Sequence, residues 1–390
     1  MTSGAVSDFD VVLVGGGLAS VLAALMLLER HPSLRLALVE RAPRLGGSHT
    51  WCFHAADLPR AAARAVAPLV VQSWDGYEVR FPARKRRLAS PYACITSARL
   101  DQVATARLRA APNARLLVGR TVTQIEANEV ALDDGCTLRA SLVIAATGPE
   151  PGQGARGYQK FFGLELDAPN HGVSEPLLFD ACLPQHDGFR FMYLVPLAPD
   201  RLLVEETFFS DSAALDEQRS QQEIERYCAA RGIRLREVVR HERGVLPMPW
   251  QDPPFDAHAR PLAAGYRAGL FHPVTGYSFP LAVRFAMALA DSDLAQLAAE
   301  PESPSPLSAF AAEVAAARPF LHLLTRLLFE FFAPAQRFHV LEHFYRLPEP
   351  LIERFYAGEL RPLDRARIFL GAPPRGFSVG RALRAHHEAP

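Results

Sequence analysis

The first forty residues combine an apolar strand, a glycine turn, an apolar helix and a second strand that ends in an acid. These parts follow one another as the strand 10–14, the glycines 15–17, the apolar stretch 18–30, the strand 34–39 and Glu40. Because glycine has no side chain, Gly15 and Gly17 allow backbone N–H groups at the positive end of the helix to approach a pyrophosphate. Glu40 is placed to hydrogen-bond ribose hydroxyls. Ser20 replaces the third glycine of the usual fingerprint, but the flanking strands, helix and acid stand at the expected distances, so we predict an adenine dinucleotide site.

The position of this motif favours FAD over NAD, because the FAD cradle commonly opens the chain in flavoproteins. The run 41–47 fits a loop that continues along the flavin, and 142–148 indicates a buried strand with a small-residue turn that closes over a dinucleotide. The segment 265–277 places a turn before a helix, whose N-terminus favours the negative charge of a reduced flavin or a pyrophosphate. The predicted cofactor-binding residues are Gly15, Gly17, Leu18, Ala19, Glu40, Gly148, Gly276 and Tyr277.

The composition indicates a globular chain of enzyme size. With 390 residues, 49% of them hydrophobic, the chain can bury a large core and form two connected domains. Its formal net charge of +0 argues against nucleic acid as a partner, since nucleic acid binding requires a basic face. The basic run 84–87 is the exception. We interpret it as a solvated loop, with contact to anionic lipid headgroups or to phosphate as the alternative.

Cysteine usage and the chain ends indicate an intracellular protein. The five cysteines are far apart, odd in number and form no CxxC pair, so they predict neither a disulfide framework nor a zinc site, and they fit a reducing cytoplasm. The N-terminus lacks the basic region of a signal peptide. The apolar block 320–332 contains His322, Arg326 and Glu330 and is shorter than the roughly twenty apolar residues of a membrane span. No transmembrane helix is therefore predicted.

We predict an α/β fold with a Rossmann-type FAD-binding domain, an inserted antiparallel-sheet substrate domain and a helical C-terminal tail. The segment 51–115 is expected to contain turns, the basic run and a helix over 97–111, and the short strands expected over 116–148 feed the sheet of the FAD-binding domain. Apolar and polar residues alternate in 163–167, 188–195 and 201–209, which indicates an antiparallel sheet suited to cover a cofactor. Helices are expected over 213–231 and 279–299, before the proline-rich run 301–306. The predicted parts are 8–157 and 256–300 for the FAD-binding domain, 158–255 for the inserted domain and 301–390 for the tail.

Three further groups of residues stand out: His49 to His54, Glu205 to Thr207, and 271–277. With the glycine turn, they resemble bacterial lycopene cyclases of the carotenoid pathway. Proteins of that family carry GxGLAS, HTWxFH, DGxRFxYxLPL, E-acid-T, GxxxGxFHPxTGYS and FYxLPxxLIxRFYAG motifs in this order. The corresponding segments here are 15–20, 49–54, 187–197, 205–207, 265–278 and 344–358. Val195 stands where that strand pattern has leucine, and Glu206 stands where aspartate is common, which leaves the role of Glu205 intact. The resemblance spans nearly the whole chain.

The resemblance implies a redox-neutral isomerase, a lycopene β-cyclase that converts lycopene to γ-carotene and then β-carotene. In this reaction an acid protonates the terminal double bond of the end group, an internal alkene captures the tertiary cation, and the new ring loses a proton. Such a site needs a proton donor and acceptor, an environment that stabilises a cation, and an apolar tunnel that excludes water. The family is understood to require reduced FAD, with NAD(P)H as the reductant. The expected location is cytoplasmic, with peripheral association to the inner membrane, because the carotene arrives from a bilayer.

The candidate catalytic residues are Glu205, Glu206, His49 and Trp51. By similarity to the essential acid of the family, Glu205 is the expected acid/base, and a carboxyl in an apolar pocket has a raised pKa that keeps it protonated. Adjacent strand residues point to opposite faces, so Glu205 and Glu206 do not both face one cavity in a regular strand. The Trp51 indole can stabilise a carbocation through its ring face. Four weaker candidates are His54, His272, Tyr277 and Asp187.

Two rival functions share this sequence pattern. A flavin monooxygenase or isoprenoid reductase acting on a hydrophobic substrate has the same cradle and consumes NAD(P)H or oxygen in proportion to product. A carotenoid-binding flavoprotein binds pigment without changing it. The aromatic residues of the tail are expected in the core, with an amphipathic membrane-docking surface as the alternative. They are Phe320, Phe331, Phe332, Phe344, Tyr345 and Phe355.

Overall fold

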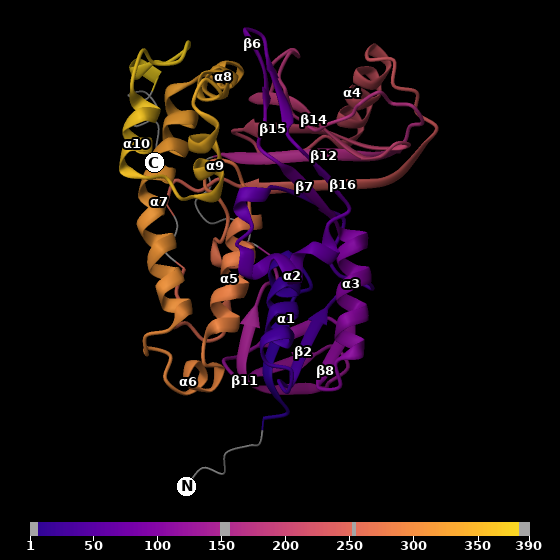
Figure 1. The fold of residues 1–390 in the computed structure, drawn as a ribbon, viewed down its shortest axis with the longest axis vertical. Coiled ribbons are helices and arrows are strands. Elements are labelled where there is room, and N and C mark those ends of the chain that lie inside the picture. Colours follow the sequence, from indigo (N-terminus) through magenta and orange to yellow (C-terminus); the bar gives the residue numbers. More distant parts are fainter. Residues whose placement is uncertain (1–6, 149–156, 252–254, 382–390) are drawn as a thin grey trace.

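A computed structural model describes residues 7–148, 157–251 and 255–381. It contains two large sheets, one at each end of the elongated molecule, with long helices along one side (Figure 1). The first sheet has parallel strands in the order β8 (Ala114–Val118), β2 (Leu36–Glu40), β1 (Phe9–Val14) and β11 (Thr137–Ala145). Two antiparallel strands, β10 (Glu129–Leu132) and β9 (Val122–Ile125), extend it. This part confirms the predicted Rossmann-type architecture.

The glycine turn leads from β1 into α1 (Leu18–Arg30), which is buried along most of its length. A helix that is apolar on nearly all sides must be covered by other elements. α1 packs against α5 (Phe279–Asp291). The short strand β17 (Leu262–Ala263) pairs in parallel with β11. The chain therefore returns to the first sheet after the inserted domain, as predicted. The helix expected over 279–299 is interrupted, because Asp293 caps a separate helix, α6 (Leu294–Ala299).

The second sheet has seven strands, antiparallel except for the β13/β5 pair. Their order is β16 (Glu237–Pro247), β12 (Tyr158–Asp167), β15 (Arg201–Ser210), β14 (Phe189–Ala198), β13 (Leu177–Asp180), β5 (Tyr77–Phe81) and β6 (Arg84–Leu88). The helix α4 (Glu217–Ala230) packs on β12 and β15. Its buried residues join one face of the sheet in a common core. The predicted antiparallel sheet is confirmed.

The strands predicted within 116–148 are confirmed in the first sheet as β9, β10 and β11, whereas strands of the segment 51–115 lie elsewhere. β5 and β6 belong to the second sheet, and β3 (Thr50–His54), β7 (Tyr92–Thr96) and β4 (Gln72–Trp74) form a small sheet of their own. The basic run 84–87 is strand β6 rather than a solvated loop. Its charges have acidic partners within the fold: Arg87 pairs with Glu175 at 2.8 Å, and Arg86 lies 3.4 Å from Glu349. The helix predicted over 97–111 is α3 (Ser97–Ala110).

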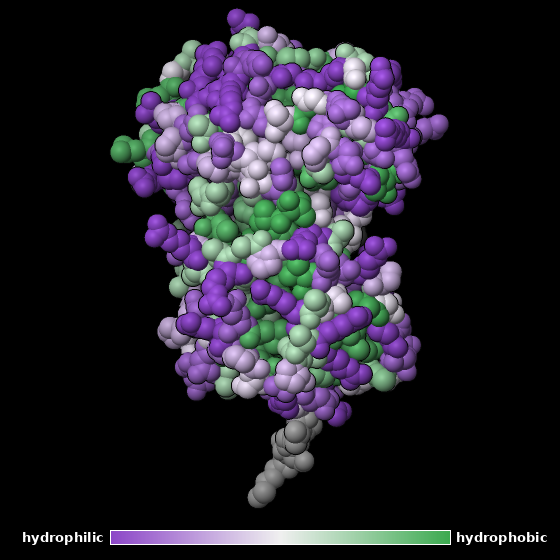
Figure 2. Space-filling model, turned by 45° about the vertical axis from the view of Figure 1, so that its right-hand side comes forward, coloured by the Kyte–Doolittle hydropathy of each residue, from purple (hydrophilic) through white to green (hydrophobic). Residues whose placement is uncertain are grey.

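The tail consists of helices, as predicted: α7 (Pro306–Phe331), α8 (Phe338–Phe344), α9 (Glu349–Ala357) and α10 (Pro362–Phe369). Its aromatic side chains pack mainly into the core, where Phe344, Tyr345 and Phe355 join a buried cluster with Phe179 and Phe189 of the second sheet. The tail therefore covers the face of that sheet that α4 leaves open. In the view of Figure 2, hydrophilic side chains cover the two ends of the molecule and hydrophobic ones gather at its waist.

Within the described residues, α7 is the one helix long and apolar enough to cross a membrane by length and composition. The apolar block 320–332 is only the second half of this helix, which has 26 residues. Arg318 and Glu330 are both buried in the fold. The Arg318 guanidinium donates to the Gly269 carbonyl at 2.9 Å, and Arg326 pairs with Glu330 at 2.7 Å. These contacts and its packing against α5 join α7 to the rest of the fold, and 28% of its most apolar window is buried.

Candidate active site

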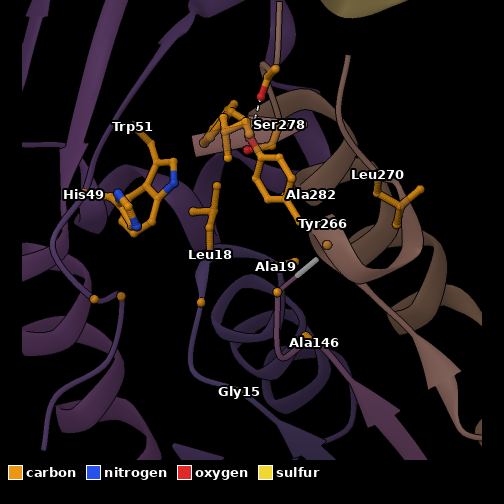
Figure 3. Close-up of a pocket in the computed structure, with 18 of the residues that line it drawn as sticks. Gly15, Leu18, Ala19, His49, Trp51, Ala146, Tyr266, Leu270, Ser278 and Ala282 are labelled. Atoms are coloured by element: carbon orange, nitrogen blue, oxygen red, sulfur yellow. Dashed lines mark hydrogen bonds between the residues drawn. The ribbon is translucent and has the colours of Figure 1, made fainter. Parts of the chain in front are cut away.

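A cavity of about 840 Å³ joins the glycine turn to one face of the second sheet. The first sheet contributes the turns after β1 and β11, the small sheet contributes β3, and the second sheet contributes residues of β12, β15 and β16. In Figure 3, Leu18, Ala19 and Gly15 lie along one wall, with Tyr266, Ser278 and Ala282 beside them and His49 and Trp51 on the other side. The cavity is in the size range of ligand and cofactor sites.

The glycine turn has the geometry of a pyrophosphate cradle. Gly15 has φ +97°, and a Cβ at this position would lie 2.6 Å from the Ala146 carbonyl oxygen, so only glycine fits. Gly17 caps α1 with ordinary extended backbone, and a Cβ there would meet no protein atom within 4 Å. Since Gly17 lines the cavity, the open space beside it lies at the positive end of α1. A phosphate group can therefore approach the backbone closely at Gly17.

Glu40 ends β2 at the mouth of this cradle. Its Oε2 accepts a hydrogen bond from the Gly16 N–H at 2.6 Å, and its Oε1 accepts one from the Ala42 N–H at 2.8 Å. Each carboxylate oxygen can accept a second hydrogen bond. The side chain is thus held in place with acceptor capacity left for ribose hydroxyls. This arrangement and the open space at Gly17 fit an adenine dinucleotide such as FAD.

The remaining predicted cofactor residues also line the cavity: Leu18, Ala19, Gly148, Gly276 and Tyr277. Tyr277 donates its hydroxyl to Asp57 at 2.6 Å, which fixes the ring between the return segment and the small sheet. The structure therefore brings all eight predicted cofactor residues to one cavity, and the contacts that each makes with a cofactor remain a prediction.

The two adjacent acids of β15 point to opposite faces of the second sheet. Glu205 lines the cavity, and its Oε1 accepts a hydrogen bond from the Thr207 hydroxyl at 2.5 Å. Glu206 is 1% exposed on the α4 side, where it forms an ion pair with Arg190 at 2.5 Å. The alternation of a regular strand causes this separation. Of the two, only Glu205 is positioned to meet a molecule in the cavity.

A second acid, Glu242 of β16, lies in the same cavity and was not recognised in the sequence. It is 3% exposed and forms an ion pair with Arg240 at 3.0 Å. Burial and the nearby negative charge of Glu242 raise the pKa of the Glu205 carboxyl well above its ordinary value. Burial also raises the pKa of Glu242, while Arg240 opposes that rise. Glu242 belongs to no motif that the sequence analysis used, and only strand pairing brings it to Glu205.

His49 and Trp51 stand at the edge of the cavity, with ring centroids 5.9 Å apart (Figure 3). Burial lowers the pKa of His49, and the positive charge of Arg240 lowers it further. The imidazole is therefore neutral at neutral pH. Trp51 belongs to β3 and its side chain lines the cavity.

The weaker candidates lie in different places. His54 lines the cavity beside Tyr77, whose hydroxyl is 3.3 Å from its Nε2. His272 is buried against the Phe355 ring, and burial lowers its pKa to about 3, so it is a neutral core residue. Asp187 pairs with Lys160 at 2.7 Å away from the cavity lining. Within the described ranges, no group of three or more His, Cys, Asp or Glu side chains could hold a metal ion.

Comparison with solved structures shows the fold of flavin enzymes. A probable FAD-dependent monooxygenase from Pseudomonas aeruginosa superposes with a TM-score of 0.59 at 16% identity, covering 85% of this chain and 98% of that one. A geranylgeranyl bacteriochlorophyll reductase-like protein from Thermoplasma acidophilum gives 0.62 at 16% identity, covering 97% and 96%. At these identities the likeness concerns the fold alone.

Sequence comparison is more specific. The lycopene β-cyclase of Pantoea ananas is 41% identical over 378 residues, covering 94% of this chain and 95% of that protein. The lycopene β-cyclase of Paracoccus sp. is 38% identical over 395 residues, covering 98% of both. The family described as "Lycopene cyclase protein" matches residues 10–382. This chain therefore belongs to the lycopene cyclase family.

Proposed function

We propose that this protein is a lycopene β-cyclase, an isomerase that closes the ψ end groups of lycopene to β-ionone rings. The observation that carries the proposal is the carboxyl of Glu205, which faces the cavity beside the dinucleotide cradle and whose pKa is raised by burial, which favours its protonated form. The names of the bacterial relatives support the substrate, because the chain aligns with them over nearly its full length.

In the proposed reaction, Glu205 donates its proton to the terminal alkene of the end group. An internal alkene then attacks the tertiary cation, and the new ring returns one proton to the carboxylate, so no electrons are exchanged overall. The Trp51 ring lies where it can stabilise positive charge, and neutral His49 adds no competing charge. Aromatic side chains of the lining, including Phe161 and Phe191, exclude water that would trap the cation. Glu206 supports the fold through its ion pair with Arg190.

The cradle residues would hold FAD, with the pyrophosphate at Gly17 and the ribose at Glu40. When bound, the reduced flavin supplies an electron-rich ring beside the substrate. We infer that NAD(P)H serves as the reductant. Reduction of the flavin activates the enzyme, and no NAD(P)H is consumed in the cyclisation itself.

We expect the purified protein to convert lycopene to cyclic carotenes anaerobically when FAD and a reductant are present. Because cyclisation is redox-neutral, product should exceed reductant consumed by at least tenfold. The measurement is chromatographic quantification of carotenes alongside NAD(P)H absorbance. A one-to-one ratio of saturated product to reductant would indicate an isoprenoid reductase, an oxygen-dependent product would indicate a monooxygenase, and unchanged lycopene would indicate a binding protein.

We further propose that the protein works as a cytoplasmic protein attached peripherally to the inner membrane through a C-terminal patch. The patch consists of Leu363, Phe369, Leu370, Phe377 and Val379, with the exposed arginines Arg361, Arg367 and Arg375. Leu363 and Leu370 are 84% and 72% exposed. Apolar side chains interleaved with arginines suit the interface of an anionic bilayer, where the apolar groups enter the acyl boundary and the arginines meet the headgroups. The patch lies on and after α10, at the end of the tail (Figure 1).

This docking proposal predicts that Leu363→Asp combined with Leu370→Asp lowers binding to anionic liposomes at least tenfold. Burying each leucine is worth up to about 1.5–3 kcal/mol, and an acid at the same place is repelled by anionic lipid. Val239→Asp is the matched control, since Val239 is 44% exposed on β16 outside the patch. Liposome sedimentation at low and high salt measures the effect. Equal binding by the double variant and the parent would refute the patch as the docking surface.

A further inference from the structure

Glu205 and Glu242 lie on either side of a glycine in the second sheet. Strand β12 pairs with β15 on one side and with the edge strand β16 on the other, and Gly163 is directly opposite Glu205 in one pair and Glu242 in the other. Residues opposite each other in neighbouring strands share one face of the sheet. The two acids therefore belong to one row, two strand spacings apart, and Gly163 stands between them.

The absence of a side chain at position 163 allows the two carboxyl groups to meet. A Cβ built on Gly163 would lie 3.0 Å from Cγ of Glu242 and 3.3 Å from Cβ of Glu205. Both acidic side chains therefore lean over the glycine. This places the two carboxyl groups where a hydrogen bond between them can form, and each carboxyl influences the pKa of the other. Two carboxyl groups can form such a bond only when they hold at least one proton.

The surroundings decide which acid carries the proton. Arg240 donates to Glu242 at 3.0 Å, and it is itself held by Glu165 at 3.0 Å and by the Thr50 hydroxyl at 2.8 Å. Glu205 has no cation at hydrogen-bonding distance among the described contacts and accepts only from Thr207 in the same strand. An adjacent guanidinium favours the ionised form of a carboxyl. The charge therefore resides on Glu242 and the proton on Glu205.

We propose that Glu242 is a positioning residue for the proposed acid, forming with Glu205 across Gly163 a carboxyl pair that holds one proton. This inference rests on the proposed cyclase function. In the reaction, the O–H bond of Glu205 breaks as a C–H bond forms on the alkene, and the ring C–H bond that breaks later returns its proton to the pair. Before proton transfer, Glu242 balances Arg240. After transfer, the new carboxylate of Glu205 balances the substrate cation, so the net charge of the site does not change.

Around the pair, the pKa values of Tyr193, Cys52 and His49 are shifted away from neutral pH. Tyr193 of β14 is opposite Glu205, and burial raises its pKa well above the ordinary value. Burial likewise raises the pKa of the Cys52 thiol in β3. Burial and Arg240 lower the pKa of His49. Glu165 contacts Arg240 from β12. The alkaline limb of the activity profile therefore reports the carboxyl pair.

Glu242→Gln tests the pair through the pH profile of cyclisation. An acid is active below its pKa, and removing the neighbouring negative charge lowers the pKa of Glu205, so activity is lost at a lower pH. We expect the alkaline limb to move down by about 1–3 pH units, the usual effect of a close charge. Glu165→Gln is the matched control, because it also removes a carboxylate partner from Arg240 but leaves the pair intact. If the alkaline limb of Glu242→Gln lies at the same pH as that of the parent protein, the proposal is overturned.

Two further measurements test the carboxyl pair if Glu242→Gln does not fold or if the protein does not cyclise lycopene. Gly163→Ala inserts a methyl group between the acids on an ordinary strand backbone and should shift the limb in the same direction. Infrared spectroscopy of the flavin-bound protein without carotene should show a protonated carboxyl band at pH 7. The band should disappear in Glu205→Gln and titrate at lower pH in Glu242→Gln. A band that is absent in the parent, or unchanged in Glu242→Gln, would refute the pair. Failure of the parent to cyclise lycopene would instead refute only the proposed function.

Discussion

Glu205→Gln should lower the rate of lycopene cyclisation by about a thousandfold or more while leaving the fold and bound FAD unchanged. A carboxylate about 4 Å from a cation, at an effective dielectric constant near 20, is worth roughly 4 kcal/mol. This free energy corresponds to about three orders of magnitude in rate, and the loss of proton transfer adds to it. The amide has nearly the same shape and still accepts the Thr207 hydroxyl. The measurement is the initial rate of carotene cyclisation per bound flavin.

Glu206→Gln is the matched control on the other face of the same strand. It weakens the ion pair with Arg190, which is 2% exposed, but Arg190 keeps its 2.8 Å contact with Glu223. We therefore expect a loss of about 1–3 kcal/mol in the free energy of unfolding, below the value typical for breaking a buried pair. Cyclisation by the folded protein should stay within tenfold of the parent. The opposite result, with an active Glu205→Gln and an inactive but stable Glu206→Gln, would place the acid one residue further along the chain.

Gly17→Val should yield a folded protein that does not retain flavin. The backbone at Gly17 suits any residue and a Cβ would meet no protein atom, so the fold tolerates the side chain. The added methyl groups project into the cradle and separate the pyrophosphate from the backbone. Losing two hydrogen bonds to a charged group costs about 3–6 kcal/mol, which corresponds to about a 10²–10⁴-fold weaker affinity.

Flavin absorbance per chain and circular dichroism of the purified protein measure this effect. Gly380→Val is a suitable control, because a Cβ at Gly380 also meets no protein atom and the residue lies outside the cavity lining. A Gly17→Val protein that carries as much FAD as the control would contradict the cradle.

The dinucleotide cradle could be predicted from the sequence because every part of it is local. Gly15, Gly17 and Glu40 lie within one strand-turn-helix-strand unit, and the conformations that these residues require allow few alternatives. The opposite directions of Glu205 and Glu206 were predictable for the same reason, since alternation is a property of a single strand.

The set of strands that forms the second sheet could not be predicted from local patterns. Strands β5 and β6 belong to this sheet because β5 pairs in parallel with β13. The two paired strands are separated by about a hundred residues of sequence. The basic run looks like a solvated loop in the sequence, but it pairs with β5, and acids of distant segments, Glu175 and Glu349, lie beside Arg87 and Arg86. Pairing between distant strands depends on tertiary packing, which no local pattern encodes.

By itself, the sequence determined the FAD-type cradle, the family resemblance and the choice of Glu205 as the candidate acid, because each depends on residue type at short spacing. Only the tertiary structure decided what surrounds that acid. The register of β12 with β15 and β16 places Glu205 and Glu242 in one row, on either side of Gly163. A carboxyl group acquires its protonation state from burial and neighbouring charges, and both arise only when strands distant in sequence are aligned side by side.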